Sequence, residues 1–215
     1  MADYSKLDHF SLKAQKEGYP ARSVFKLKEM DEKFGLIKPG SPKAREPFKV
    51  LDLGAAPGSW SLYVMRKLSI RSFTTEDEPS LVSIDLAPLS RQYDQGLFDE
   101  PSFLFSQGDF TTAEIRDTIH SLGPYNLVLS DAAPATTGNR SVDTLRSLDL
   151  AETVLSYAET ALAKNGNMVV KVFQGGDTGT LLKKIRCLFE TGKSFKPQSC
   201  RSESFETYYV GLGKK

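Results

Sequence analysis

The sequence predicts an α/β fold in which a mostly parallel sheet carries helices on both faces. The first observation is that short apolar runs alternate with helical segments along most of the chain. The second is that these runs are almost continuously apolar, as in strands buried on both faces. The third is a glycine-containing loop directly after the first run, where open parallel sheets bind ligands.

The first half of the chain opens with a predicted helix over 21–34. In this helix Val24, Phe25, Leu27, Met30 and Phe34 are expected to point inward. Apolar runs and helical spacing then predict these elements in order: strand 50–53, helix 59–68, strand 81–86, strand 103–105 and helix 113–122.

The second half continues the alternation. It predicts a strand over 126–129, a helix over 145–163 and a strand over 168–173. Asn165-Gly166 is expected to end the helix, because glycine accepts the left-handed capping conformation. A helix over 181–189 and two late strands near 194–196 and 206–212 complete the prediction.

Length and composition favour one globular domain over residues 1–215. The chain is 40% hydrophobic and 26% charged, which is ordinary for a globular protein. Residues 1–20 form a basic N-terminal segment. Residues 41–47 and 69–80 are predicted surface loops, and the loop 69–80 is an insertion. No apolar run is long enough to span a membrane, and no signal peptide begins the sequence. Two cysteines, Cys187 and Cys200, fit no metal or redox motif, so we expect no metal and a cytoplasmic location.

Charge is distributed unevenly although its formal total is only +1. Residues 1–50 carry +4 and residues 183–215 carry +5, whereas 51–182 carries −8. Basic ends around an acidic centre suggest an anionic partner at the ends. Ordinary variation between surface segments explains the pattern equally well, so charge alone does not decide.

A glycine loop follows the first predicted strand. The segment that contains the end of the strand and this loop is Asp52-Leu53-Gly54-Ala55-Ala56-Pro57-Gly58-Ser59-Trp60. Gly54 and Gly58 allow backbone to approach a ligand closely because they lack a Cβ atom. The loop is neither the dinucleotide fingerprint Gly-x-Gly-x-x-Gly nor a P-loop, which disfavours a pyrophosphate cradle. The alternative is a tight strand-to-helix turn without a ligand.

Three aspartates follow successive predicted strands. Asp85 could accept both hydroxyls of a ribose, and Asp109 could meet an adenine amino group. Asp131 ends the fourth predicted strand. One such aspartate is more often a helix cap than a ligand contact. Three of them beside a glycine loop favour an adenosine-type pocket.

Six segments carry a resemblance to a known family, in the family's order along nearly the whole chain. They are 13–19 (KAQKEGY), 21–27 (ARSVFKL), 52–60 (DLGAAPGSW), 130–134 (SDAAP), 170–175 (VKVFQG) and 199–206 (SCRSESFE). With these segments the sequence resembles the FtsJ/RrmJ family of ribose 2′-O-methyltransferases, which use S-adenosylmethionine. The resemblance implies a Rossmann-like class I methyltransferase sheet of about seven strands, the last one antiparallel.

The resemblance also implies site residues. The family's catalytic tetrad falls on Lys26, Asp131, Lys171 and Glu206. Together with the loop around them, the expected contacts to S-adenosyl-L-methionine are Gly54, Ala56, Pro57, Gly58, Trp60, Asp85, Asp109, Phe110 and Asp131. The chain departs from the family at Ala135, where several relatives carry Asn, and around 74–80, which is longer than in bacterial relatives.

The tetrad also makes chemical sense. A ribose 2′-hydroxyl must be oriented against the methyl group and must lose one proton. Lysine accepts a proton only when neutral, so a lysine base needs a pKa below its usual value of about 10.4. We expect Lys171 to be the general base and Lys26 to tune it. Asp131 would lie between cofactor and Lys171, and Glu206 would anchor Lys26 or the substrate.

The expected partner is ribosomal RNA, and the expected substrate a uridine of large-subunit (23S-type) ribosomal RNA, because 170–175 and 130–134 resemble that branch of the family. Basic residues at both ends would contact phosphates, namely Lys13, Lys16, Arg22, Lys28, Lys38, Lys193, Lys196 and Arg201. No RNA-recognition module is evident, and a monomer is expected. Three alternatives stay open: a tRNA methyltransferase of the same family, a non-catalytic RNA-binding ribosome-assembly factor, and a nicotinamide oxidoreductase.

Overall fold

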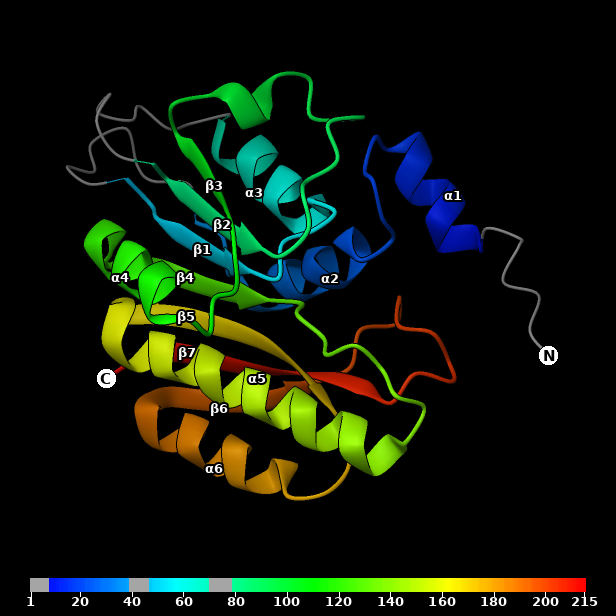
Figure 1. The fold of residues 1–215 in the computed structure, drawn as a ribbon, viewed down its shortest axis with the longest axis vertical. Coiled ribbons are helices and arrows are strands. Elements are labelled where there is room, and N and C mark those ends of the chain that lie inside the picture. Colours follow the sequence, from blue (N-terminus) through cyan, green and yellow to red (C-terminus); the bar gives the residue numbers. More distant parts are fainter. Residues whose placement is uncertain (1–7, 39–46, 70–78) are drawn as a thin grey trace.

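One seven-stranded sheet forms the centre of the molecule (Figure 1). A computed structural model describes residues 8–38, 47–69 and 79–215. The strand order is β3-β2-β1-β4-β5-β7-β6. The strands are β1 (Val50–Leu53), β2 (Leu81–Asp85), β3 (Phe103–Gln107), β4 (Tyr125–Ser130), β5 (Leu162–Phe173), β6 (Phe189–Phe195) and β7 (Glu206–Lys214). The predicted α/β class and seven strands are therefore confirmed.

Helices cover both faces of this sheet. They are α1 (His9–Lys16), α2 (Val24–Phe34), α3 (Ser59–Ser69), α4 (Ala113–Leu122), α5 (Arg140–Ala161) and α6 (Thr178–Leu188), with a 3₁₀ turn η1 (Leu97–Asp99). The buried side chains of α2 and α3 pack on one face, and those of α4, α5 and α6 pack on the other (Figure 1). Burial from both sides explains why the central strands are almost continuously apolar in sequence.

The direction of the strands determines where a site can form. Strands β1 to β5 pair in parallel, so their carboxyl ends share one edge of the sheet. Strand β7 runs antiparallel to β5, as the family resemblance implied. The start of β7 therefore lies beside the end of β5, with Glu206 opposite Phe173.

The starts of α2 and α5 were predicted wrongly. Helix α2 begins at Val24 instead of 21, because the backbone N–H and carbonyl of Ala21 bond to the Ser59 hydroxyl at 2.8 and 3.2 Å. Helix α5 begins five residues early, where Asn139 caps it by accepting from the N–H groups of Ser141 and Val142.

The ends of α5 and α6 also differ from the prediction. Helix α5 ends at Ala161, because Leu162 already pairs with Tyr125 in the sheet, and Asn165 lies within β5 with φ 64°. Phe189 opens β6 opposite Lys214 instead of ending α6. The sequence did not predict α1 or η1. The predicted loops at 41–47 and 69–80 lie largely outside the described residues.

The described residues contain neither a membrane-spanning helix nor a metal-binding cluster. In residues 8–38, 47–69 and 79–215, none of the helices is long and apolar enough to cross a membrane. The same ranges hold no group of three or more His, Cys, Asp or Glu side chains arranged to bind a metal.

Candidate active site

The four side chains of the predicted tetrad meet at the carboxyl edge of the sheet. Lys26 comes from α2, Asp131 follows β4, Lys171 lies in β5 and Glu206 opens β7. The Lys171 Nζ is 3.1 Å from Asp131 Oδ1 and donates to the Asp131 backbone carbonyl at 2.5 Å. The Lys26 Nζ is 2.8 Å from Glu206 Oε1. Each of the two pairs thus joins one lysine and one carboxylate.

Sheet topology brings these residues together across 180 positions of sequence. Strand β4 pairs with β5 in parallel, with Ser130 opposite Val170. Asp131, just past the end of β4, therefore lies beside the last residues of β5. Strand β5 pairs with β7 so that Lys171 lies opposite Tyr208 and Phe173 opposite Glu206. Directly paired residues point to the same face of a sheet, and so do residues two positions apart on one strand. Lys171, Phe173, Glu206 and Tyr208 therefore share one face of the sheet, the face covered by α2, which contributes Lys26.

The two pairs are buried and electrically coupled. The Lys26, Lys171 and Glu206 residues are only 8–9% exposed. Burial by itself would raise the pKa of Asp131, but the ammonium groups of Lys171 and Lys26 outweigh it and hold that pKa below its usual value. Burial likewise opposes the charge on Lys26, yet the carboxylates of Asp131 and Glu206 raise its pKa. Asp131 is therefore an anion and Lys26 a cation at neutral pH.

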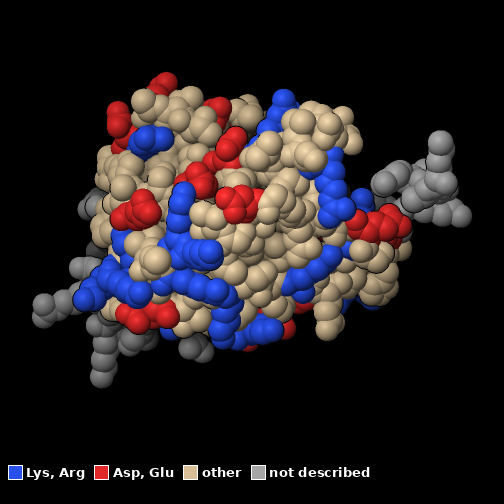
Figure 2. Space-filling model, turned by 90° about the horizontal axis from the view of Figure 1, so that it is seen from below, with Lys and Arg blue, Asp and Glu red and all other residues tan. Residues whose placement is uncertain are grey.

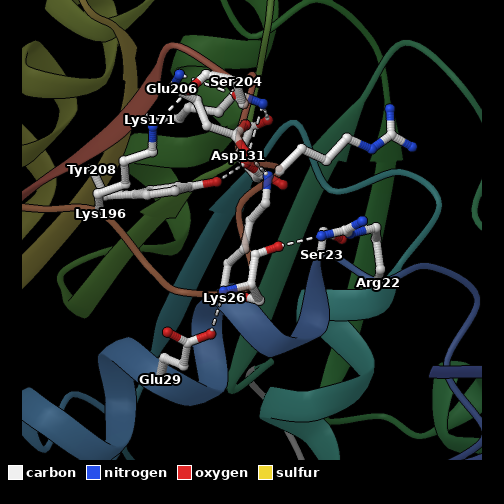
Figure 3. Close-up of polar contacts among 12 residues, drawn as sticks. Arg22, Ser23, Lys26, Glu29, Asp131, Lys171, Lys196, Ser204, Glu206 and Tyr208 are labelled. Carbon is white, nitrogen blue, oxygen red and sulfur yellow. Dashed lines mark hydrogen bonds and ion pairs between the residues drawn. The ribbon is translucent and has the colours of Figure 1, made fainter. Parts of the chain in front are cut away.

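Tyr208 is a site residue that was not among those expected from the sequence. Its hydroxyl donates to Asp131 Oδ1 at 2.6 Å, and the Lys26 Nζ lies 5.7 Å from its ring centroid. Figure 3 shows Tyr208 and Lys26 both pointing toward Asp131. Burial and the nearby Asp131 raise the pKa of the hydroxyl, so it remains a donor. The period of two in a strand could have indicated it, because Tyr208 shares a face with Glu206.

A cavity of about 650 Å³ opens next to these pairs, over the carboxyl ends of β1, β2 and β4. Six of the predicted cofactor contacts line it: Gly54, Ala56, Asp85, Asp109, Phe110 and Asp131. Pro57, Gly58 and Trp60 do not line it. Trp60 is 2% exposed and donates its indole N–H to the Ser23 carbonyl at 2.8 Å, so it joins α3 to the start of α2.

The glycine loop is held against the cavity by its neighbours. The Asp85 carboxylate accepts from the N–H of Ala56 and of Ala87, each at 2.8 Å. A Cβ atom on Gly54 would lie 2.6–2.9 Å from Ala132, and the residue has φ +76°, so only glycine fits there. Asp109 accepts from the N–H and the hydroxyl of Thr111, which fixes its side chain in a local turn.

The charges around the cavity define what it can hold. Four carboxylates line it, those of Asp85, Asp109, Asp131 and Asp149, against the single guanidinium of Arg146. An acidic lining attracts a cation and repels phosphate groups. The cavity thus suits a positively charged ligand with hydroxyl and amino groups, and it does not suit a pyrophosphate-bearing dinucleotide.

The two basic ends of the chain meet beside this site. Glu29 on α2 accepts from the backbone N–H groups of Gln198 at 2.6 Å and Ser199 at 2.8 Å. Arg22 donates to the Ser199 carbonyl, and Phe34 packs edge-on against Phe195 with ring centroids 5.6 Å apart. Figure 2 shows the molecule from the side of α6 and β6. On this face Lys and Arg side chains form several groups at the surface, and fewer Asp and Glu side chains than Lys and Arg side chains lie within these groups.

Comparisons with known proteins agree with this geometry. The FtsJ-like methyltransferase family model matches residues 19–214. A ribosomal RNA large subunit methyltransferase E from Treponema denticola is 48% identical over 99% of this chain and 97% of its own length. The proteins of that name from Oleidesulfovibrio alaskensis and Borrelia garinii are 43% and 41% identical, over 97% and 95% of this chain and 92% and 95% of their own lengths.

Solved structures share the fold at lower identity. A crystal structure of a ribosomal RNA methyltransferase from Plasmodium falciparum superposes with a TM-score of 0.71 at 23% identity, covering 91% of this chain and 98% of the other. Human methyltransferase-like protein 13, in complex with SAH, superposes with a TM-score of 0.57 at 11% identity, covering 86% and 80%.

The sheet order and the acidic cavity at its carboxyl edge define a methyltransferase of the Rossmann-like class. Within that class the chain belongs to the FtsJ-like methyltransferase family.

Proposed function

We propose that this chain is an S-adenosylmethionine-dependent RNA 2′-O-ribose methyltransferase that modifies a uridine of large-subunit ribosomal RNA. One observation carries the proposal. Asp131 lines the acidic cavity and at the same time pairs with the Lys171 Nζ at 3.1 Å. The cavity for the methyl donor and the lysine for the acceptor hydroxyl therefore share one wall.

The residues present fit the cofactor. When bound, S-adenosylmethionine supplies a methyl group on a positively charged sulfur. Asp85 and Asp109 line the cavity at the ends of β2 and β3, where they would accept from the ribose hydroxyls and the adenine amino group. Glycine at position 54 lets the loop after β1 pack directly against Ala132, and both residues line the cavity that would hold the ligand.

The tetrad would then prepare the acceptor. In its neutral form the Lys171 amine would accept a hydrogen bond from the 2′-hydroxyl and take its proton, becoming an ammonium beside Asp131, while the hydroxyl oxygen takes up the methyl group that S-adenosylmethionine supplies. Asp131 pairs with that amine at 3.1 Å, and the Tyr208 hydroxyl donates to the same Asp131 oxygen at 2.6 Å, which would keep the carboxylate in place for Lys171. Lys26, held by Glu206, keeps its positive charge beside the oxygen that becomes more negative when it loses its proton.

The substrate assignment is supported by relatives and by charge. Proteins 41–48% identical to this chain along nearly its whole length bear the name ribosomal RNA large subunit methyltransferase E. The two basic ends of the chain meet through the contacts of Glu29 and Arg22 with residues 198 and 199, which puts cationic surface beside the tetrad. We further propose that residues 1–215 act as a single-domain monomer.

The test is methyl transfer from labelled S-adenosylmethionine to large ribosomal subunits that lack the modification, with tRNA in parallel. Lys171→Met should lower kcat by at least about a hundredfold, the size of a general-base contribution, without weakening cofactor binding. Lys164→Met is the matched control, because Lys164 lies exposed on the same strand and should leave kcat unchanged.

Each other result has a clear meaning. Full activity of Lys171→Met would refute the proposed base. Label in tRNA alone would replace the substrate and keep the chemistry. Subunits bound without any transfer by the wild type would indicate a non-catalytic assembly factor.

A further inference from the structure

We propose that Phe205 and Arg140 form a stacking site for the nucleobase of the target nucleotide. This inference rests on the proposed function, because it assigns a place to the base whose ribose carries the acceptor hydroxyl. Phe205 directly precedes Glu206 of the tetrad, and neither Phe205 nor Arg140 lines the acidic cofactor cavity.

The two side chains lie against each other at the edge of the sheet, beside Phe173. The Phe205 and Phe173 ring centroids are 4.6 Å apart at an interplanar angle of 58°. The Arg140 guanidinium carbon lies over the Phe205 ring, 5.1 Å from its centroid. The Phe205 carbonyl accepts from the Gln174 N–H at 2.7 Å, which fixes the backbone that carries the ring.

Register places this stack next to the tetrad. Phe173 lies two residues after Lys171 on the same face of β5, and it is paired with Glu206 on β7. Phe205 directly precedes Glu206. A nucleobase is attached to the ribose carbon adjacent to the one that bears the 2′-hydroxyl, so the base must lie within a few ångström of the Lys171 amine.

The other flat side chains around the tetrad are unable to stack on a base. In the part of the chain that the structure describes, Tyr208 is 0% exposed, Trp60 2% and Phe173 8%. Phe205 is half-buried and Arg140 is exposed. Proteins that recognise RNA stack unpaired bases on aromatic rings and on the planes of arginine guanidinium groups. Phe205 and Arg140 offer both kinds of surface, and the base would insert between them as the exposed Arg140 side chain moves off the ring that it now covers.

The test is steady-state methyl transfer to unmodified large ribosomal subunits by Phe205→Ala and Phe205→Tyr. The loss of one base stack should lower kcat/KM for the subunits at least about fivefold in Phe205→Ala, mostly through KM. Phe205→Tyr keeps the ring and should stay within twofold of the wild type. Phe48→Ala is the matched control, since Phe48 is also half-buried but precedes β1, at the opposite edge of the sheet from the site.

A second measurement separates stacking from apolar bulk and from a failure of the proposed function. A single-stranded RNA trinucleotide containing 2-aminopurine should lose fluorescence on binding to the wild type, because stacking quenches this base. Quenching should disappear in Phe205→Leu, while the dissociation constant for S-adenosylmethionine stays within twofold. Equal kcat/KM of wild type and Phe205→Ala, or equal quenching by wild type and Phe205→Leu, would overturn the inference. Quenching that depends on Phe205, without methyl transfer by the wild type, would refute the proposed function alone.

Discussion

Asp52 is a buried carboxyl group in β1, directly before the glycine loop, and it makes the stability of the fold depend on pH. It is 0% exposed. Its Oδ2 accepts from the Ser61 hydroxyl at 2.7 Å, and Ser61 in turn contacts the Ser83 hydroxyl at 3.0 Å. Within residues 8–38, 47–69 and 79–215 its Oδ1 has no hydrogen-bond partner. Burial raises the pKa of Asp52 to about 7.

The size of the effect follows from the two pKa values. In the unfolded chain the group has its ordinary pKa of 3.8. Between that value and pH 7 the folded state binds more protons than the unfolded state. The contribution of Asp52 to the free energy of unfolding is therefore highest below pH 3.8, falls as the pH rises and levels off above pH 7. Between pH 5 and pH 8 the contribution of Asp52 decreases by about 2–3 kcal/mol.

Asp52→Asn should remove this dependence, because asparagine has the shape of the protonated carboxyl and no charge. Relative to the wild type, the variant should gain about 2–3 kcal/mol of unfolding free energy when the pH is raised from 5 to 8. Urea unfolding followed by fluorescence measures it directly, since Trp60 is the one tryptophan of the chain and lies in the core.

Asp117→Asn is the control for the loss of a carboxylate in general, because Asp117 is exposed on α4. Its difference from the wild type should be the same at pH 5 and pH 8. If the difference between Asp52→Asn and the wild type were also the same at both pH values, the reasoning from burial would be wrong.

Three further predictions follow from the site. Gly54→Ala should abolish binding of S-adenosylmethionine in calorimetry, because the new Cβ would lie 2.6–2.9 Å from the loop after β4; Gly96→Ala, at φ +83° with nothing within 4 Å, should bind normally. Glu29→Gln should lose about 1–3 kcal/mol of unfolding free energy, since an amide oxygen is unable to replace both bonds to residues 198 and 199, whereas Glu32→Gln, exposed on the same helix, should not. Asp131→Asn should destabilise the protein at pH 7, because it leaves two lysines less well paired. The difference in unfolding free energy from the wild type should shrink as the pH falls below 4, since the pKa of Asp131 is held low and its stabilisation is lost on protonation. Parallel stability curves of variant and wild type from pH 7 to 3 would contradict this.

Sequence alone predicted the elements that local pattern determines. Strand β1 and helix α4 occur at the predicted residues, because a continuous apolar run and a helical period leave little choice of structure. The tetrad was predicted from the resemblance to the FtsJ/RrmJ family, and the structure brings Lys26, Asp131, Lys171 and Glu206 together. Their catalytic roles stay a prediction.

Tertiary structure alone decided features that depend on partners far along the chain. Tyr208 joins the site because β7 pairs with β5 in one register, and its hydroxyl thereby reaches Asp131 across 77 positions. Glu29 binds backbone groups 169 and 170 positions away, so no local pattern marks it. The end of α5 at Ala161 likewise reflects the pairing of Leu162 with Tyr125, which outweighs the local stop signal at Asn165-Gly166. Local periodicity determines whether a segment can form a helix or a strand. Strand register and long-range hydrogen bonds determine where the segment ends and which side chains meet. The energy of these long-range contacts depends on residues that the local sequence does not contain.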